Sequence, residues 1–346
     1  MDAAEVLKKF LTQGLQLDLE SLNFFTTSPD KINIFLETIG KEAVRPSTIT
    51  KKEIQKLLPE SDAKIKIVEM FPTIHETLTV EEMTEMFQKQ YEQIKKLLSN
   101  RVDLPNTISI NKISDRIKQF SVVATVLEID GRILTLEDST GKISTRLAAE
   151  VEQEAGLLIL DETAGFVCEK TEDDIIIKKI IQPDITFKKE IKKTTEDTLV
   201  LFSPSEKIQE INAQIKFFFQ QNEIKVIMNS SVQILPDPCI IDISDVKIFL
   251  SSGKDLENFK NKLGVSSARV LLNLVKKRLL HPSKPFIRDT FFEEIPDIFV
   301  VNFFGEAEDI KYKGTEFLSL GSEDSSRVGW IVNLRTRENV KISLDK

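Results

Sequence analysis

The chain has 346 residues, enough for two or three domains, and its 41% hydrophobic and 29% charged residues are typical of a soluble globular protein. Its formal net charge of −8 argues against a surface dominated by phosphate binding. Because no run approaches about 18 uncharged apolar residues and the N-terminus lacks a signal-peptide pattern, we expect a cytoplasmic protein that neither crosses a membrane nor is secreted.

Residues 1–60 are predicted to form a small helical module. Apolar residues recur at helical spacing in AAEVLKKFLTQGL and DKINIFLETIGKEA, with Gly14 and Gly40 as stop signals. Thr50 precedes Glu53 by three residues, which is the spacing of a capping box at the start of a third helix. We expect this module to present an apolar face to a partner or to the next domain.

Residues 61–106 are predicted to be a linker that includes the strand KIKIVEM and leads into a long helix, VEEMTEMFQKQYEQIKKLLSN. Met83, Phe87, Ile94 and Leu98 share one face of that helix. Such a stripe can fill the docking groove of a partner, but packing in a core is the favoured interpretation.

Residues 107–190 are predicted to form a small β-barrel. SVVATVLEIDGRILTLEDSTGKISTRLA contains three alternating strands joined by turns at Gly131 and Gly141. A helical stretch around VEQEAGLL follows, and then two more strands, TAGFVCEK and DDIIIKKIIQPD. Five strands with a helix between the third and the fourth is the order of an OB-fold.

An OB-fold suggests nucleic-acid binding, but the strands RILTLEDS and KISTRLA contain no aromatic residue on which bases could stack. The positive charges of Lys142 and Arg146 are offset by Glu137, Asp138 and Glu150. A barrel that docks proteins is therefore favoured over one that binds single-stranded DNA.

Residues 191–346 are predicted to form an α/β domain. Its strands IKVIM and VKIFL are short, β-branched and followed by small polar residues, as expected for buried strands that deliver loops to one edge of a sheet. The expected strands cover 198–202, 224–228, 239–243, 246–250, 297–304, 315–320 and 328–333, and the expected helices cover 205–221, 255–263 and 266–280.

The last of these helices ends in Lys276, Lys277 and Arg278, which suit the helix dipole. They are interpreted either as a solvated last turn, which is favoured, or as a contact with a partner subunit or DNA phosphate. Cys168 and Cys239 lie in apolar strands and are expected to be buried free thiols of a reducing cytoplasm.

Several of these segments together resemble the small subunit of archaeal family D DNA polymerase and the B subunits of eukaryotic replicative polymerases. The resemblance rests on LEDSTG in the barrel and on LPDPCIIDISDVKIFLSSGKD, LLNLVKKRLLHP and EEIPDIFVVNFFGEAEDIKYKGTEFLSLGS. It implies a multidomain α+β protein with an N-terminal helical domain, an OB-fold, and a calcineurin-like phosphoesterase sandwich of reduced size. In many archaeal members of this family the last domain is a two-metal nuclease.

The ligand positions of that nuclease are filled by residues that do not suit a pair of cations, which need converging His, Asp and Asn side chains. In the order of the family's motifs these positions fall on Pro204, Glu206, Ser230, Ser252, Phe303 and Gly305. The Gly-Asp motif, expected beyond the helix 205–221, has no counterpart, which suggests a deleted unit before IKVIM. His75 and His281 lie outside every motif. We therefore expect no catalytic residue, no metal and no cofactor.

The resemblance implies a non-catalytic scaffolding subunit in DNA replication, located with the nucleoid, or in the nucleus if the source is eukaryotic. Its expected partners are the large catalytic subunit of a DNA polymerase, DNA through that complex, and other replication factors bound by the N-terminal helices. Two alternatives stay open. One is a residual metal-dependent 3′–5′ exonuclease using Asp242, Asp245, Asp297 and Glu306, and the other is a stand-alone OB-fold protein that binds single-stranded DNA.

Overall fold

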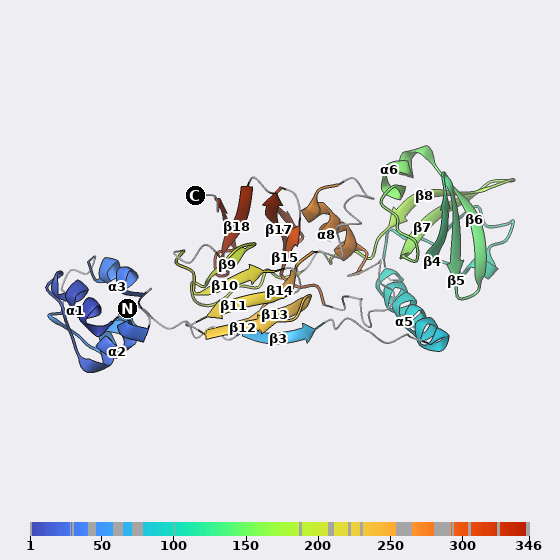
Figure 1. The fold of residues 1–346 in the computed structure, drawn as a ribbon. Helices are drawn as coiled ribbons and strands as arrows, with labels where there is room; N and C mark the ends of the chain where they lie inside the picture. The colour runs from blue at the N-terminus through green and yellow to red at the C-terminus, as the bar shows by residue number, and fades with distance from the viewer. Residues whose placement is uncertain are drawn as a thin grey trace.

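The computed structural model describes residues 2–27, 29, 31–40, 46–57, 65–70, 79–99, 101–186, 189–206, 211–220, 223–228, 231–253, 265–279, 292, 294–303, 306–323 and 326–343. The chain is a mixed α and β protein with extensive β-structure and a few helices (Figure 1). Within the described residues, no helix combines the length and apolar character needed to span a bilayer.

The N-terminal module contains four short helices and a two-stranded parallel ladder. The helices are α1 (Ala3–Leu11), α2 (Leu19–Thr27), α3 (Lys31–Gly40) and α4 (Lys51–Leu57), and the strands are β1 (Gln16–Leu17) and β2 (Thr48–Ile49). Helix α2 was not predicted. Phe10, Phe25 and Phe35 form the buried centre, with ring centroids of Phe10 and Phe25 4.7 Å apart. The residues of this core cluster all lie within the module.

Helix α5 (Val80–Leu98) confirms the predicted long helix and begins with a capping box between Thr79 and Glu82. It packs on the barrel through Ile94 and Leu98, which contact Val123. The apolar stripe is therefore core packing in the C-terminal half of the helix. Met83 and Phe87 in the first half are only half-buried.

The predicted barrel is confirmed. Strands β4 (Gln119–Asp130), β5 (Ile133–Asp138), β6 (Gly141–Leu147), β7 (Thr163–Lys170) and β8 (Ile175–Ile181) close in the order β4-β5-β6-β8-β7. Two short helical turns, η2 (Ala149–Val151) and α6 (Glu152–Ala155), connect β6 to β7, and η1 (Ile110–Lys112) precedes β4. This is the strand order of an OB-fold.

The C-terminal part is built on a 12-stranded sheet with the main order β12-β11-β10-β9-β18-β17-β15-β14-β13-β3, with β16 beside β17 and β19 beside β18. Its strands are β3 (Ile65–Met70), β9 (Leu199–Ser203), β10 (Ile215–Phe219), β11 (Ile224–Met228), β12 (Ser231–Leu235), β13 (Cys239–Ile243), β14 (Val246–Ser251), β15 (Ile298–Phe303), β16 (Glu308–Tyr312), β17 (Thr315–Glu323), β18 (Ser326–Asn333) and β19 (Glu338–Ser343).

Two expectations for this sheet were wrong. The segment 205–221 is not one helix, because Ile215–Phe219 forms β10, which pairs in parallel with β9. Its run IKFFF is buried on both faces, and a short apolar run of that kind fits a central strand as well as a helix. The strand KIKIVEM, which we had placed in a linker, is β3, and it pairs with β13 at one end of the sheet.

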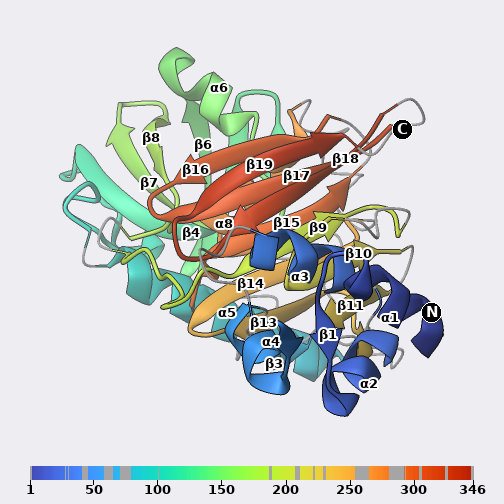
Figure 2. The ribbon, with the colours of Figure 1, turned by 90° about the vertical axis from the view of Figure 1, so that its left-hand side faces the viewer.

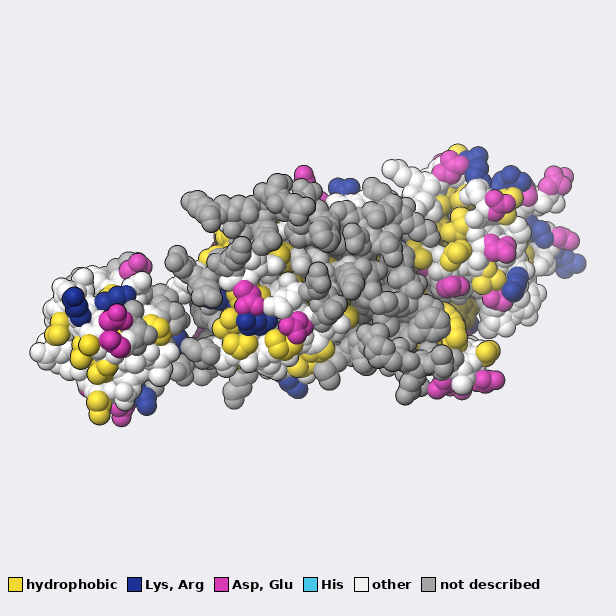
Figure 3. Space-filling view, in the orientation of Figure 1, with side chains coloured by type: hydrophobic (Ala, Val, Ile, Leu, Met, Phe, Trp, Pro, Cys, Tyr) yellow, Lys and Arg dark blue, Asp and Glu magenta, His cyan; other side chains and the backbone are white. Residues whose placement is uncertain are grey.

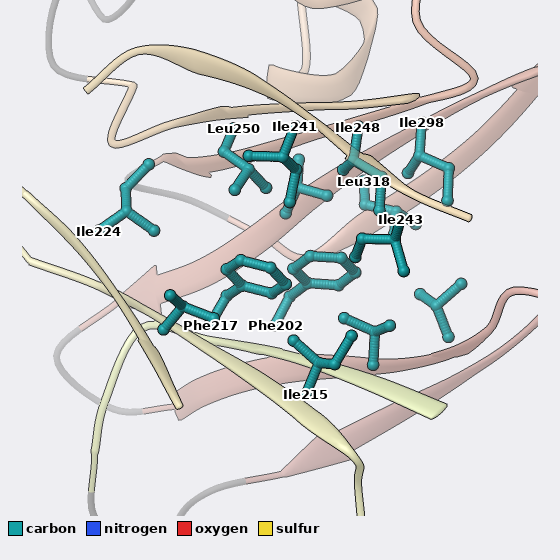
Figure 4. Packing of buried hydrophobic residues seen from close by; sticks show 14 of the residues in the cluster. Phe202, Ile215, Phe217, Ile224, Ile241, Ile243, Ile248, Leu250, Ile298 and Leu318 are labelled. Atoms are coloured by element: carbon teal, nitrogen blue, oxygen red, sulfur yellow. The ribbon is translucent and has the colours of Figure 1, made fainter. Parts of the chain in front are cut away.

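The sheet curves so that strands distant in its order enclose one hydrophobic core (Figure 2). This cluster joins Phe202 and Phe217 from β9 and β10, whose rings stack at 5.4 Å, to Ile241 and Ile248 from β13 and β14 (Figure 4). A second cluster lies under α8 (Ser267–Lys276), which packs on Phe249 and neighbouring residues of the opposite face. The helix predicted at 255–263 lies outside the described residues.

Candidate functional site

The candidate site is one edge of the large sheet, which we call the carboxyl edge. Strands β9, β10, β14, β15 and β17 run in the same direction, since β18 is antiparallel to both β9 and β17. Their carboxyl ends therefore lie along one edge, where sheets of this kind usually bind ligands. The residues after β9, β14 and β15 define this edge, and they include Pro204, Glu206 and Ser252 of the positions predicted above. Strand β11 (IKVIM) is antiparallel to β10, so its carboxyl end lies at the opposite edge, and the expectation that IKVIM and VKIFL deliver loops to one edge was wrong.

The loop after β9 is fixed by its own hydrogen bonds. The Ser203 hydroxyl donates to the Ser205 carbonyl at 2.7 Å and accepts from the Ser205 amide at 3.1 Å. Pro204 lies between them and has no side-chain donor atom for a metal. The Glu206 carboxylate is engaged by Lys225 at 2.6 Å and by the Gln220 amide at 2.6 Å. The charge of Glu206 is thus offset by a lysine of β11.

The loop after β14 is tightly packed. Gly253 has φ +76°, and a side chain there would meet the Asn302 carbonyl at 2.9 Å and Val301 at 2.8 Å. The Gly253 amide donates to the Ser251 hydroxyl at 3.1 Å, and the Ser252 amide donates to Asp237 at 2.8 Å. Only glycine fits this position without strain, because both its backbone angle and its close contact exclude a Cβ.

Asn302 lies near the end of β15, and its side-chain oxygen is buried with no hydrogen-bond partner within the described structure. The backbone of Phe303 ends the strand. Ser230 and Gly305 lie outside the described residues, as do His75 and His281. Four of the predicted positions therefore lie at the carboxyl edge, because each follows or ends one of the parallel strands. They are Pro204, Glu206, Ser252 and Phe303.

The described side chains at this edge offer hydroxyl and amide oxygens and three carboxylates. Glu206 is paired with Lys225, Asp237 accepts the Ser252 amide, and Glu306 follows β15. Hard divalent cations are held mainly by carboxylates, and a two-metal centre also needs ligands that clamp both ions. Across the part of the chain that the structure describes, no three His, Cys, Asp or Glu side chains gather in a way that could hold a metal. The residues present do not fit the two-metal centre of the resembling family.

The four carboxylates of the exonuclease alternative are divided between the two edges of the sheet. Asp242 and Asp245 flank the turn before β14, where Asp242 accepts the Asp245 amide at 2.9 Å, and Asp297 directly precedes β15. All three lie at the edge of the sheet where the parallel strands β14 and β15 begin, Asp242 near the carboxyl end of the antiparallel β13. Glu306 follows β15 and is therefore at the opposite edge. The structure does not bring these four side chains together.

Asp297 instead belongs to a buried polar cluster at the amino ends. It is 5% exposed and accepts the Lys247 amide at 2.9 Å, while Lys189 lies 3.3 Å from its other oxygen. The Lys189 ammonium also donates to the carbonyls of Ile295 and Pro296 at 2.7 and 2.6 Å. Burial lowers the pKa of Lys189, and the Asp297 charge opposes that effect. This cluster ties the connector after the barrel to the sheet.

A second buried polar cluster, which we call the barrel junction, joins the barrel to α8. Lys277 and Glu162 form an ion pair in which the two side chains are 3% and 1% exposed. Arg278 donates to the carbonyls of Phe292 at 3.1 Å and Asp184 at 3.0 Å. Burial lowers the pKa of Lys277, opposed by the charge of Glu162. Both basic residues are therefore internal, and the expectation of a solvated turn or a contact with DNA was wrong for them.

Lys276 differs from its neighbours, since its ammonium lies over the Tyr312 ring at 4.4 Å. Nothing in the sequence of the basic run predicts which of its three residues is buried and which is not. The partner of Lys277 is Glu162, more than one hundred residues earlier in the chain, so spacing along the sequence could not reveal it.

The strands β5 and β6 of the barrel present a surface of paired charges. Lys142 pairs with Glu137 at 3.4 Å, and Arg146 pairs with Asp174 at 3.0 Å. Ile133 on β5 is 40% exposed, and neither strand contains an aromatic residue. A surface without stacking rings and with its cations paired lacks the features that hold single-stranded nucleic acid.

Cys168 and Cys239 are buried and unpaired with each other, as predicted. Burial raises the pKa of each thiol to about 12. At neutral pH both are therefore protonated and chemically inert.

Comparisons with known proteins give little. No protein-family model matches the chain, and no curated protein matches it. Among solved structures, the crystal structure of the Stn1–Ten1 complex from S. pombe is similar over 23% of this chain and 77% of that chain, with 20% sequence identity and a TM-score of 0.20. A score this low supports no conclusion about fold or function.

Proposed function

We propose that the chain is a non-catalytic accessory subunit of a replicative DNA polymerase, which docks the large catalytic subunit and reaches DNA through that complex. In this proposal the large sheet with α8 is a reduced calcineurin-like phosphoesterase domain that has lost its metal ligands, and the OB-type barrel serves as a protein-docking module. The proposal rests on the resemblance in the sequence and on the carboxyl edge of the sheet.

The carboxyl edge is the observation that carries the proposal. The sheet still delivers loops from β9, β14 and β15 to one edge, but Pro204 offers no ligand and Glu206 is paired with Lys225. A fold retained without its ligand set supports a role that depends on surface and shape.

The barrel junction supports a scaffolding role in a second way. Lys277 and Glu162 form a buried ion pair, and Arg278 donates to the Asp184 carbonyl, so several polar contacts join the barrel to α8. A partner that contacts both parts would meet one surface with a fixed geometry, and binding to it would need little reordering.

Purification of the tagged chain from its native cell tests this proposal. We expect a large DNA polymerase subunit to co-purify, identified by mass spectrometry. Its absence from the purified material would overturn the proposal.

The two alternatives predict other outcomes. A residual exonuclease would digest single-stranded DNA with manganese, and the digestion would be lost in a Glu306→Gln variant. A stand-alone single-strand binding protein would shift DNA in a gel at low salt, where phosphate contacts are strongest. We expect neither result from the isolated chain.

A further inference from the structure

The geometry points to a docking site on strand β12 for an extended segment of a partner protein, which would add to the large sheet as a further strand. This inference is independent of the polymerase proposal, because it concerns the open end of the sheet and not its carboxyl edge.

Strand β12 is the first strand in the order of the large sheet, and among the described residues it pairs with β11 alone. The pairing runs without a register shift from Ile224 opposite Leu235 to Met228 opposite Ser231. Because an antiparallel strand directs part of its amides and carbonyls to each side, the free side of β12 presents a row of backbone donors and acceptors.

Two of the four exposed side chains of β12 are apolar. Val232 and Ile234 are 59% and 50% exposed. They are two residues apart and therefore project from the same face of the sheet, opposite Ile227 and Lys225 of β11. Figure 3 shows hydrophobic side chains on the lower side of the large sheet, where Figure 1 draws both β12 and β3.

The other strands at the ends of this sheet carry charges. Among the described strands, β3, β16 and β19 also pair with one neighbour each in the large sheet. Their sequences are IKIVEM, EDIKY and ENVKIS, each with at least two charged residues, and the β3 pairing contains a register irregularity. Strand β12 has the sequence SVQIL, without charge, proline or bulge. Charges and bulges are how proteins prevent unwanted strand pairing, and β12 lacks these devices.

The occupant is a segment of another protein and not a second copy of this chain. Five residues of strand extend only about 17 Å, which is too short for the roughly 1,200 Å² or more that a stable dimer buries. A short edge is sufficient for a peptide, because main-chain hydrogen bonds supply its affinity and pockets or patches for alternate side chains supply its specificity. The segment should therefore carry two apolar β-branched residues two positions apart, to meet Val232 and Ile234.

The test uses the full chain and a labelled, capped octapeptide with valine at alternate positions, threonine between them and a lysine at each end. We expect fluorescence anisotropy to show saturable binding. Ile234→Lys should weaken it by about tenfold or more, since a charge on an edge strand opposes pairing, and Val232→Lys should do the same. Val68→Lys on β3 is the matched control, because Val68 is 44% exposed on the opposite end strand and should leave binding unchanged.

A second probe separates strand addition from adsorption to an apolar patch. The same peptide with N-methylated amides at alternate residues keeps its side chains but loses main-chain donors, and it should not bind. Equal binding of the methylated peptide, equal loss in the Val68→Lys control, or no binding of the first peptide would each overturn the inference. A dimer of the native chain in sedimentation velocity that Ile234→Lys dissociates would overturn the choice of occupant.

Discussion

The buried ion pair of Lys277 and Glu162 shows that a run of basic residues does not by itself identify a solvated or DNA-binding surface. Lys276, Lys277 and Arg278 are consecutive, but their surroundings differ. Lys277 and Arg278 are 3% and 4% exposed, whereas the Lys276 ammonium lies over the Tyr312 ring. The sequence predicted α8 but extended it to residue 280, beyond its end at Lys276, and it could not supply the distant Glu162 carboxylate. A long-range partner of this kind leaves no local pattern.

Removing one member of this pair should destabilise the protein strongly. Lys277→Met leaves the Glu162 carboxylate buried without its partner, and we expect the free energy of unfolding to fall by about 3 kcal/mol or more. The double variant Glu162→Gln with Lys277→Met should recover a large part of this loss, because no buried charge is left unpaired. Urea unfolding measures both variants. A double variant no more stable than Lys277→Met would contradict this account.

The two cysteines give a prediction that depends on pH. Because burial raises the pKa of both thiols to about 12, almost no thiolate is present in the folded protein between pH 7 and 9. We expect a thiol reagent to leave Cys168 and Cys239 unmodified in this range and to modify both after denaturation. The raised pKa values also mean that the thiols' contribution to stability is complete below about pH 8.5 and declines as the pH rises toward 12. Rapid labelling of the native protein at pH 7 would show that these sites are open.

Gly253 fixes the loop at the carboxyl edge. Gly253→Ala should lower the free energy of unfolding by about 2 kcal/mol, because a Cβ at φ +76° is strained and would meet the Asn302 carbonyl at 2.9 Å. Gly156→Ala is the control, since φ there is −60° and the nearest atom to a new Cβ is 3.5 Å away. The control should be neutral or slightly stabilising. Equal effects of the two changes would show that the loop can relax.

Among the elements, those with a clear period were predicted well and the short apolar runs were not. The barrel follows from the alternation in β5 and β6 and from turns at Gly131 and Gly141, and α5 follows from its capping box at Thr79. IKFFF in β10 is buried on both faces, so it lacks the alternation that identifies a strand. It was taken as part of a helix because burial on both faces is visible only once β9 and β11 flank it.

Strand β3 was predicted to lie in a linker, but it belongs to the large sheet, where it pairs with β13. Deleting residues 1–60 removes the N-terminal module, whose core is its own, and should leave the thermal midpoint of the remaining chain nearly unchanged. Deleting residues 1–75 also removes β3 and the packing of Ile65 and Ile67 on the main core. We expect this longer deletion to cost about 3 kcal/mol, at about 1.5 kcal/mol for each isoleucine. Equal midpoints for the two truncations would mean that β3 is dispensable.

At the scale of the whole molecule, the structure joins an OB-type barrel to a large curved sheet through the barrel junction and the Lys189 cluster. The sequence predicted both parts and their order, because each has local patterns of its own. It could not predict the contacts between them, since residues such as Glu162 and Lys277 or Lys189 and Asp297 meet only after both parts have folded. At the candidate site, residue type alone indicates that Pro204 and Ser252 do not suit a metal, and the absence of a metal there stays a prediction.

The most direct test of the central claim is to purify the tagged chain from its native cell at endogenous level and to measure which chains accompany it and in what ratio. The account predicts a large DNA polymerase subunit in equimolar amount, with primer-extension activity in the purified complex. Recovery of the chain without any large polymerase subunit, and without primer-extension activity, would contradict it.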